Sequence, residues 1–431
     1  MKTEIIPHET EVTPALIQQS LQPVYGEARL FQGLPETTDI LLHGQLVHVT
    51  EVCPDESYDD SFPYTVTRFG RFFRYTTDYG YTGYIQDGGE RVQTARYLSE
   101  FQTPKDIGYA DAERYENIWG QYAGIGEKYL EAYREVEEKG LGNIYNPHAS
   151  LATVWAGAAD LFPVQDITDT VSGRMTLYRG AKLLVAEDQS GVKEGWTRVY
   201  PASTMFYGEG DFLEEEALGA DAFFGEGEEE AEKEQEQEPE GAWYIRSSAL
   251  KAPFRLVDVT YDADTRMENC SVYGRVRPQE EEAFRRNVTE TAKLYLGAQY
   301  RWAGKTISGI DCSGLCSMAY MLNGVYIFRD ARIEEGYPVR ELVSAEEWKD
   351  HRAEALSRMK PGDLLYYKGH IAMYLGEERY IHATGRAGSD GVVINSLNPS
   401  APDYRQDLDE GLLAVGSIFV PLQPLSLRKE I

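Results

Sequence analysis

Cys312 is the side chain of this sequence best placed to act as a nucleophile. A thiol at its ordinary pKa is mostly protonated at neutral pH, so a reactive cysteine needs surroundings that favour the thiolate. Gly309–Asp311 breaks the preceding segment, and a helical pattern begins at Cys312. The macrodipole and the unpaired N–H groups at a helix start stabilise negative charge, and they can also bind an oxyanion. The position therefore predicts that Cys312 is a thiolate nucleophile.

Two of the seven histidines, His370 and His382, lie where a base could reach that thiol. His370 opens a predicted strand directly after a glycine, and His382 lies near the end of the next predicted strand. Neighbouring antiparallel strands can bring two such rings together, so we predict His370 as general base and His382 as the residue that orients it. The remaining histidines fall in loops, N-terminal strands or a charged helix and are not expected to act: His8, His43, His48, His148 and His351.

The four cysteines argue against a metal or a disulfide framework. Cys53, Cys270, Cys312 and Cys316 contain no C-x-x-C pair, and none has zinc-type histidine spacing. Cys316 lies one helical turn after Cys312 and is interpreted as a small buried hydrophobic residue. We therefore expect no metal and no cofactor.

The predicted elements of the last third of the chain have an order that would position these groups. Helical patterns over Glu281–Leu296 and Cys312–Leu322 precede a long connection and four predicted strands, Asp363–Tyr367, Ile371–Leu375, Tyr380–His382 and Val392–Ser396. A nucleophile helix ahead of an antiparallel sheet that carries the bases is the papain-type layout. The sequence thus predicts an α+β papain-like domain.

The rest of the chain predicts a multidomain protein with two small all-β barrels. Short apolar runs broken by glycine, proline and aspartate indicate antiparallel strands, whereas aromatic residues three and four apart within 110–138 indicate helix. We expect a first barrel at 1–105, a helical insert or linker at 106–145, a second barrel at 146–252, a linker at 253–279 and the peptidase domain at 280–423.

Charge is distributed unevenly along the chain. The net charge is −29, and residues 209–240 contain fifteen Asp or Glu against one Lys. We interpret residues 208–241 as a disordered acidic loop inserted in the second barrel, between Val199 and Trp243; it is either a solvated loop without a role or a functional tail. Nucleic acid is not expected as a partner, because phosphate binding needs clustered Lys and Arg.

The N-terminal residues and the hydropathy pattern bear on location. Residues 1–20 lack the apolar core of a secretory signal, and no apolar run is long enough to span a membrane. We therefore expect a soluble, cytoplasmic protein without a membrane partner. A chain from which a signal peptide had been removed would look the same and would be secreted.

Five ordered motifs together resemble a known family. They are Leu296-Gly-Ala-Gln-Tyr-Arg-Trp-Ala-Gly-Lys, Gly309-Ile-Asp-Cys-Ser-Gly-Leu, Pro361-Gly-Asp-Leu-Leu-Tyr-Tyr, Gly369-His-Ile-Ala-Met-Tyr-Leu-Gly and Tyr380-Ile-His-Ala-Thr. Over about residues 280–420 they resemble the NlpC/P60 cysteine peptidases of bacterial cell-wall peptides, which implies the same triad. Gln299 stands where proline is common and Ala303 where glycine is common.

The two N-terminal stretches resemble bacterial SH3-like (SH3b) domains, and the whole arrangement resembles the YkfC-like γ-D-glutamyl-L-diamino acid endopeptidases. That resemblance implies that Asp330, eighteen positions after Cys312, binds the free amine of the substrate. It implies that Tyr81 narrows the cleft and adds Asp311, Ser313 and Tyr300 as substrate-binding candidates. The acidic partner expected on the first SH3b domain would fall near Gln45, which is a departure.

Three functions follow from these patterns. The leading hypothesis is an endopeptidase that recycles free muropeptides, L-Ala-γ-D-Glu-diamino acid, by cutting the γ-D-glutamyl bond. The first alternative is a secreted peptidoglycan hydrolase that binds the intact wall through its SH3b domains. The second is a wall-peptide binding protein without catalysis. The identity of the diamino acid and the oligomeric state stay open.

Overall fold

The computed structural model of the 431-residue chain describes residues 13–17, 19–26, 36–52, 71–77, 79–87, 95–97, 149–168, 174–186, 188–200, 243–252, 276, 278–335 and 337–420. The predicted helical insert at 106–145 and the predicted acidic loop at 208–241 lie outside these residues, as do Cys53 and Cys270. Within the described ranges, no helix has both the length and the apolar character needed to cross a membrane.

The first β unit, residues 13–97, is one antiparallel sheet with the strand order β3-β2-β6-β5-β4-β1-β7. Its strands are short and separated by turns, as the sequence predicts, and the close pairing of β2 with β6 needs Gly83, where a Cβ would meet Val24 Cγ1 at 2.8 Å. The strands are β1 (Thr13–Ile17), β2 (Leu21–Tyr25), β3 (Thr37–Leu42), β4 (Leu46–Val52), β5 (Arg71–Thr77), β6 (Thr82–Asp87) and β7 (Ala95–Tyr97).

The second β unit, residues 149–252, has a five-stranded sheet of order β13-β12-β11-β8-β14 and a two-stranded sheet, β10-β9. Its strands are β8 (Ala149–Val154), β9 (Ala158–Leu161), β10 (Met175–Tyr178), β11 (Lys182–Ala186), β12 (Trp196–Tyr200), β13 (Trp243–Arg246) and β14 (Leu250–Lys251). Val199 of β12 lies opposite Trp243 of β13, so the two strands predicted to flank the acidic segment are paired neighbours. The antiparallel β character of both units is confirmed, but among the described residues their strand pairings do not close into barrels.

The C-terminal domain, residues 278–420, contains a six-stranded antiparallel sheet of order β17-β22-β18-β19-β20-β21. The strands are β17 (Arg340–Ser344), β18 (Leu364–Tyr367), β19 (His370–Gly376), β20 (Arg379–Thr384), β21 (Gly391–Ser396) and β22 (Leu412–Ser417), with the two-residue strands β15 (Lys305–Thr306) and β16 (Gly309–Ile310) paired apart from it. The helices are α6 (Glu281–Lys293), α7 (Cys312–Met321), α8 (Ala345–Asp350), α9 (Arg352–Arg358) and α10 (Gln406–Glu410).

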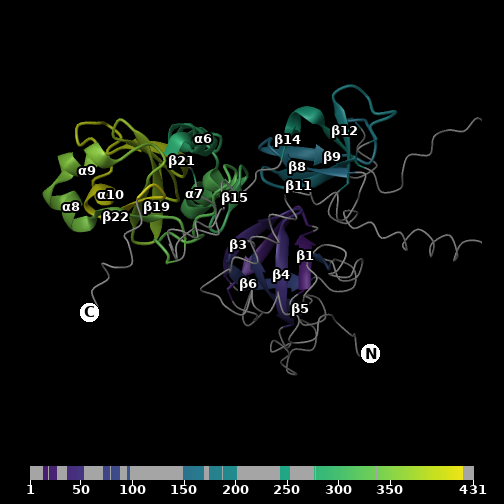
Figure 1. The fold of residues 1–431 in the computed structure, drawn as a ribbon, viewed down its shortest axis with the longest axis horizontal. Coiled ribbons are helices and arrows are strands. Elements are labelled where there is room, and N and C mark those ends of the chain that lie inside the picture. Colours follow the sequence, from purple (N-terminus) through teal and green to yellow (C-terminus); the bar gives the residue numbers. More distant parts are fainter. Residues whose placement is uncertain are drawn as a thin grey trace, which may run out of the picture.

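Helices cover both faces of this sheet (Figure 1). Alternation along β19 turns Ile371 and Met373 toward α6 and α7, while Ala372 and Tyr374 pack with residues of α8 and α9. The nucleophile helix is therefore held between α6 and the sheet. The α+β papain-like layout predicted from the sequence is confirmed.

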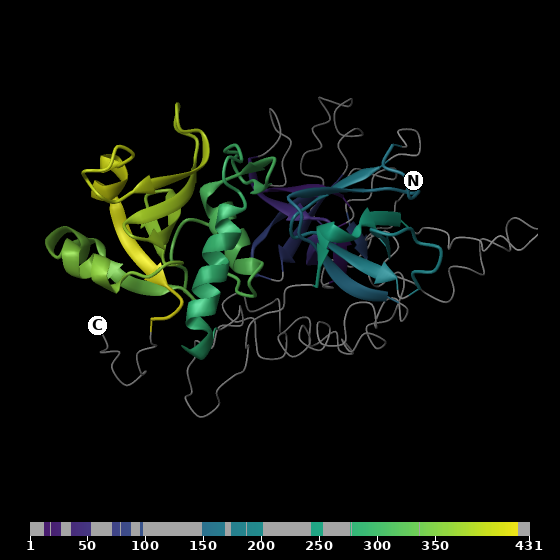
Figure 2. The ribbon, with the colours of Figure 1, turned by 90° about the horizontal axis from the view of Figure 1, so that it is seen from above.

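All three parts of the chain meet at the flank of α7. Gly180 of the second β unit allows a close approach here, because a Cβ at this position would lie 2.9 Å from both Leu42 of the first unit and Met318 of α7. Lys182 also donates its backbone N–H to the carbonyl of His43 at 2.9 Å. Figure 2 shows the two β units together on one side of the C-terminal domain. Both β units thus pack against the helix that carries the candidate nucleophile.

Candidate active site

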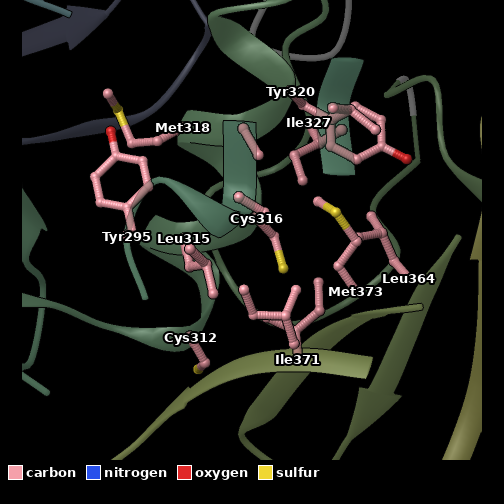
Figure 3. Packing of buried hydrophobic residues seen from close by; sticks show 14 of the residues in the cluster. Tyr295, Cys312, Leu315, Cys316, Met318, Tyr320, Ile327, Leu364, Ile371 and Met373 are labelled. Atoms are coloured by element: carbon pink, nitrogen blue, oxygen red, sulfur yellow. The ribbon is translucent and has the colours of Figure 1, made fainter. Parts of the chain in front are cut away.

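Cys312 is the first residue of α7, as predicted. Asp311 caps the helix by accepting a hydrogen bond from the Gly314 N–H at 2.5 Å. The thiol is 4 % exposed and receives the backbone N–H of Ile371, so it lies against the beginning of β19 (Figure 3). Burial, with a further contribution from Asp311, raises the pKa of Cys312 to about 11. The backbone N–H groups of Ile371 and Ser313 and the Arg329 guanidinium oppose this rise only in part, so the neutral thiol predominates before substrate binds and the thiolate stays the predicted nucleophile of the reaction.

His370 and His382 are brought together on neighbouring strands of the sheet. His370 Nε2 lies 2.8 Å from His382 Nδ1, and the two rings meet edge to face with centroids 5.0 Å apart. Met373 pairs with Ile381, so His382 lies one diagonal step from His370 on the same face of the sheet. His370 directly precedes Ile371, the residue whose N–H touches the thiol. The predicted orienting contact between the two histidines is present.

Asn395 of β21 extends this line and was not predicted. Its Oδ1 lies 2.9 Å from His382 Nε2, and its Nδ2 donates to the carbonyl of Asp403 at 2.7 Å. Asn395 pairs with Tyr380, which places it diagonally from His382 on the third strand. The sequence signal was its position in the predicted strand Val392–Ser396, but the register between strands decides whether it reaches the histidines.

These hydrogen bonds assign the protons of the network. Because the amide nitrogen of Asn395 is used by Asp403, its oxygen faces His382 and must accept the Nε2–H of that ring. His382 Nδ1 then accepts the Nε2–H of His370. The remaining nitrogen of His370, Nδ1, is unprotonated. The network of His370, His382 and Asn395, which we call the histidine network, can therefore accept a proton from a thiol at one end.

Burial keeps both rings uncharged. Desolvation, with a contribution from His382, lowers the pKa of His370 to about 3, and desolvation lowers the pKa of His382 to about 4. A thiol and an imidazole that are both neutral at rest exchange a proton during the reaction rather than before it.

Asp330, the predicted amine-binding residue, and Tyr81, predicted to narrow the cleft, come together across the boundary between the first β unit and the C-terminal domain. Tyr81 donates its hydroxyl to Asp330 Oδ1 at 3.3 Å, although 249 residues separate the two in the sequence. The Asp330 side chain remains 44 % exposed, with Arg332 at 3.9 Å. Burial raises the pKa of Asp330, while Arg329 and Arg332 oppose that shift. An exposed carboxylate edge is thus held beside an aromatic wall made by Tyr81 and Phe328.

Asp311 and Ser313, which flank Cys312, are held by Arg329. The guanidinium donates to both oxygens of Asp311 at 3.1 Å and to Ser313 Oγ at 2.6 Å. Its Nε donates to Asp39 of β3 at 2.7 Å. Gln45, the position at which the resemblance implied an acidic partner, accepts the backbone N–H of Leu42 instead. The structure therefore brings Asp311 and Ser313 to the site but engages them in internal contacts.

Tyr300 and Cys316 complete the surroundings of the thiol. The backbone of Tyr300 forms a parallel β-bridge with Ile310. Burial, with contributions from Cys312 and Asp311, raises the pKa of the Tyr300 hydroxyl to about 12. Cys316 is fully buried and lies near Ile371 and Met373 (Figure 3), which confirms its interpretation as a core residue. In the described part of the chain, His, Cys, Asp and Glu side chains do not form a group that could hold a metal ion.

A thiol at a helix start that contacts the antiparallel sheet next to a pair of hydrogen-bonded histidines is a papain-like cysteine-peptidase arrangement. Residues 297–407 match the model of the NlpC/P60 family. The chain therefore carries an NlpC/P60 domain, and the match includes all three residues of the predicted triad.

Named relatives share this domain. Dipeptidyl-peptidase 6 of Lysinibacillus sphaericus is 51 % identical over 140 residues, which are 32 % of this chain and 46 % of that protein. The γ-D-glutamyl-L-lysine dipeptidyl-peptidase of Bacillus cereus is 33 % identical over 129 residues, 28 % of this chain and 34 % of that protein. A solved NlpC/P60 family protein from Bacillus cereus is 16 % identical, with 93 % of this chain and 98 % of that chain covered and a TM-score of 0.48. The chain spans less than half the length of these two curated relatives.

Proposed function

We propose that this protein is a cysteine peptidase that hydrolyses the γ-D-glutamyl–diamino acid bond of free muropeptides with an N-terminal L-Ala. The observation that carries the proposal is the contact between Tyr81 and Asp330 beside the start of α7. Asp330 directly follows Arg329, which binds the two residues on either side of Cys312. A carboxylate linked to the candidate nucleophile through one residue, Arg329, suits a substrate whose amine lies a short distance from the cleaved bond.

The chemistry of Asp330 favours a free amine. Its exposed edge can accept a charge-assisted hydrogen bond from an ammonium group, which would offset the burial that raises its pKa. A peptide without that ammonium would leave the carboxylate partly desolvated and unpaired, which penalises N-acylated peptides and intact wall. Tyr81 would close the pocket behind a small residue such as L-Ala.

The first half of the reaction uses the histidine network. As substrate binds, the Cys312 thiol gives its proton to His370 Nδ1, and the sulfur attacks the γ-carbonyl carbon of D-Glu. Backbone N–H groups at the start of α7 stabilise the oxyanion. His370 then protonates the leaving amine of the diamino acid as the C–N bond breaks. A thioester between Cys312 and L-Ala-D-Glu remains.

The second half releases a dipeptide. Water gives a proton to His370 Nδ1 and adds to the thioester carbon, and the C–S bond breaks as the thiolate of Cys312 takes that proton back. The product is L-Ala-D-Glu with a free γ-carboxyl group. Release of a dipeptide agrees with the names of two relatives, both dipeptidyl-peptidases. We further propose that the two β units are SH3b-like modules and that the enzyme is cytoplasmic.

The test is mass-spectrometric detection of cleavage of L-Ala-γ-D-Glu-meso-diaminopimelate beside its N-acetylated form. Wild type should cut only the free-amine peptide, Cys312→Ala should cut neither, and Asp330→Asn should lose most of the preference between the two. Cleavage of both forms, or of intact sacculi alone, would instead identify a wall hydrolase. A wild-type protein that binds these peptides without cutting them would be a binding protein.

A further inference from the structure

Four charged side chains are buried together between the first β unit and the C-terminal domain. Asp39 accepts hydrogen bonds from Lys305 Nζ at 2.7 Å and from Arg329 Nε at 2.7 Å, and Arg329 also binds Asp311. Tyr79 joins them through its hydroxyl, which lies 2.7 Å from Asp39 Oδ2 and 2.7 Å from Lys305 Nζ. We call Asp39, Lys305, Arg329 and Asp311 the four-charge cluster.

The cluster is neutral as a whole and closed to water. Asp39 is 0 % exposed and the Arg329 side chain is 2 % exposed, with Lys305 and Asp311 also buried. Two carboxylates balance two cations, which is the condition under which buried charges are tolerated. Burial alone would raise the pKa of Asp39, but Lys305 and Arg329 hold it below its ordinary value. Asp39 is therefore charged, and its charge is fully used inside the protein.

Arg329 connects this cluster to the candidate nucleophile. One edge of its guanidinium, at Nε, is fixed by Asp39, while its other nitrogens hold Asp311 and Ser313. Asp311 in turn caps the helix that begins with Cys312. Because a guanidinium is planar and rigid, fixing one edge sets the direction of the others. A line of direct contacts thus runs from β3 of the first β unit to the residue beside the thiol.

Lys305 has a different part in the cluster. It donates hydrogen bonds to Asp39 and Tyr79, whereas Arg329 is the cation that binds Asp311 and Ser313. Desolvation lowers the pKa of Lys305 to about 8, and Asp39 opposes that shift. Lys305 therefore balances the charge of Asp39, whereas the contact between Asp39 and Arg329 fixes the orientation of the Arg329 guanidinium. This difference separates the two roles experimentally.

We propose that Asp39 is a positioning residue for the peptidase site: it orients Arg329, and through Arg329 the cap of α7, so the first β unit completes the catalytic machinery as well as the amine pocket. This inference rests on the proposed peptidase function. It assigns a role in catalysis to a residue that lies 273 positions before Cys312 (312 − 39).

The test compares Asp39→Leu with the double variant Asp39→Leu/Lys305→Met. The single variant leaves an unbalanced cation, so both stability and turnover should fall. The double variant removes one charge of each sign and should recover most of the urea midpoint of wild type. If Asp39 positions Arg329, kcat on the tripeptide stays on the order of 10- to 100-fold below wild type while KM changes little. Recovery of kcat together with stability would overturn the proposal.

A readout that needs no substrate keeps the two proposals apart. The rate of Cys312 alkylation by iodoacetamide, located by peptide mass spectrometry, is measured against pH. Arg329 lowers the pKa of Cys312. In the double variant Arg329 loses the contact that orients it, so its effect on the thiol should weaken and the midpoint of alkylation should move to higher pH. An unchanged alkylation profile in both Asp39 variants would contradict the positioning role, even if wild type cut no peptide. Asp160→Asn, in a partly exposed ion pair of the second β unit, is the control that should match wild type.

Discussion

Two polar networks lie close to Cys312 along the chain, one beginning next to Ile371 and the other ending at Asp311, and they are built in opposite ways. The histidine network lies wholly within the sheet of the C-terminal domain and consists of uncharged groups joined by hydrogen bonds. The four-charge cluster joins two parts of the chain and consists of ions. Both are buried. The first ends at a nitrogen that can take a proton, whereas the second ends at a helix cap.

The difference separates proton transfer from positioning. Neutral groups joined by hydrogen bonds can gain and lose a proton during a reaction at a low cost in free energy, because none of them is held in a charged form by a buried counter-ion. Buried ions at an interface, in contrast, keep one another charged, and removing one of them leaves its partner as an uncompensated buried charge. We therefore expect changes in the histidine network to affect turnover, and changes in the cluster to affect stability as well.

The largest effect should come from His370→Ala. Loss of the group that moves the thiol proton should lower kcat on the tripeptide by about 10²- to 10⁴-fold. The urea unfolding midpoint should change little, because the cluster is intact. His351→Ala, an exposed histidine at the end of α8, is the matched control and should keep wild-type turnover. Strong destabilisation by His370→Ala would contradict the expectation that the histidine network affects turnover without affecting stability.

The next effect, on stability, should come from Asp39→Ala. Breaking a buried ion pair by removing one partner costs about 3–5 kcal/mol. The matched change in the second β unit, Asp160→Ala, breaks a partly exposed ion pair with Arg174 and the hydrogen bond that Thr176 Oγ1 donates to Asp160 at 2.5 Å, and should cost about 1–2 kcal/mol. Urea titrations of both variants measure this difference. Equal losses would show that the buried cluster does not stabilise the interface.

A third prediction concerns the acid limb of activity. Because burial lowers the pKa of His370 to about 3 and of His382 to about 4, kcat/KM should persist as pH falls below 6, where an ordinary histidine protonates. It should fall only near pH 4. Asn395→Asp places a carboxylate against His382, which favours its charged form, so the limb should move to higher pH. An unchanged limb in that variant would mean that His382 does not govern it.

The smallest effect should come from Tyr81→Phe. The variant keeps the ring against Phe328 but loses the hydroxyl that donates to Asp330. A single hydrogen bond to a charged group contributes about 1.5–3 kcal/mol at most, and water can replace this one in an exposed pocket. We therefore expect kcat/KM for the free-amine peptide to fall by roughly 3- to 10-fold, chiefly through KM. A decrease in kcat with an unchanged KM would instead assign Tyr81 a role in the chemical step rather than in binding the substrate amine.

The C-terminal domain was largely predictable from the sequence because its pattern is local. The predicted helix at Glu281–Leu296 appears as α6, and the four predicted strands appear as β18 to β21 with ends shifted by one or two residues. The elements that were not predicted flank α7 or follow the four predicted strands: β15, β16, β17, α8, α9, α10 and β22. Their stability comes from tertiary packing rather than from their own propensity.

The site was predictable where motifs carry it and unpredictable where tertiary contacts do. Cys312, His370 and His382 follow from residue type and element order. The resemblance to the YkfC-like enzymes predicted Tyr81 and Asp330 as substrate-binding residues, and the structure shows their contact. Asn395 needed the strand register, and Asp39 needed the docking of two units, which no local pattern encodes. Burial, which raises the pKa of the Cys312 thiol, also depends on tertiary packing and has no signal in the local sequence.

The separation of Asp39 from its partners has a consequence for synthesis of the chain. Asp39 leaves the ribosome 266 residues before Lys305 and 290 residues before Arg329. At ordinary elongation rates of about 5–20 residues per second, that is a wait of roughly 15 to 60 s. During this time its carboxylate must stay hydrated, because neither cation exists to compensate it. A nascent chain therefore cannot assemble the cap beside Cys312 until most of the protein has been made, and an unfinished peptidase is an inactive one.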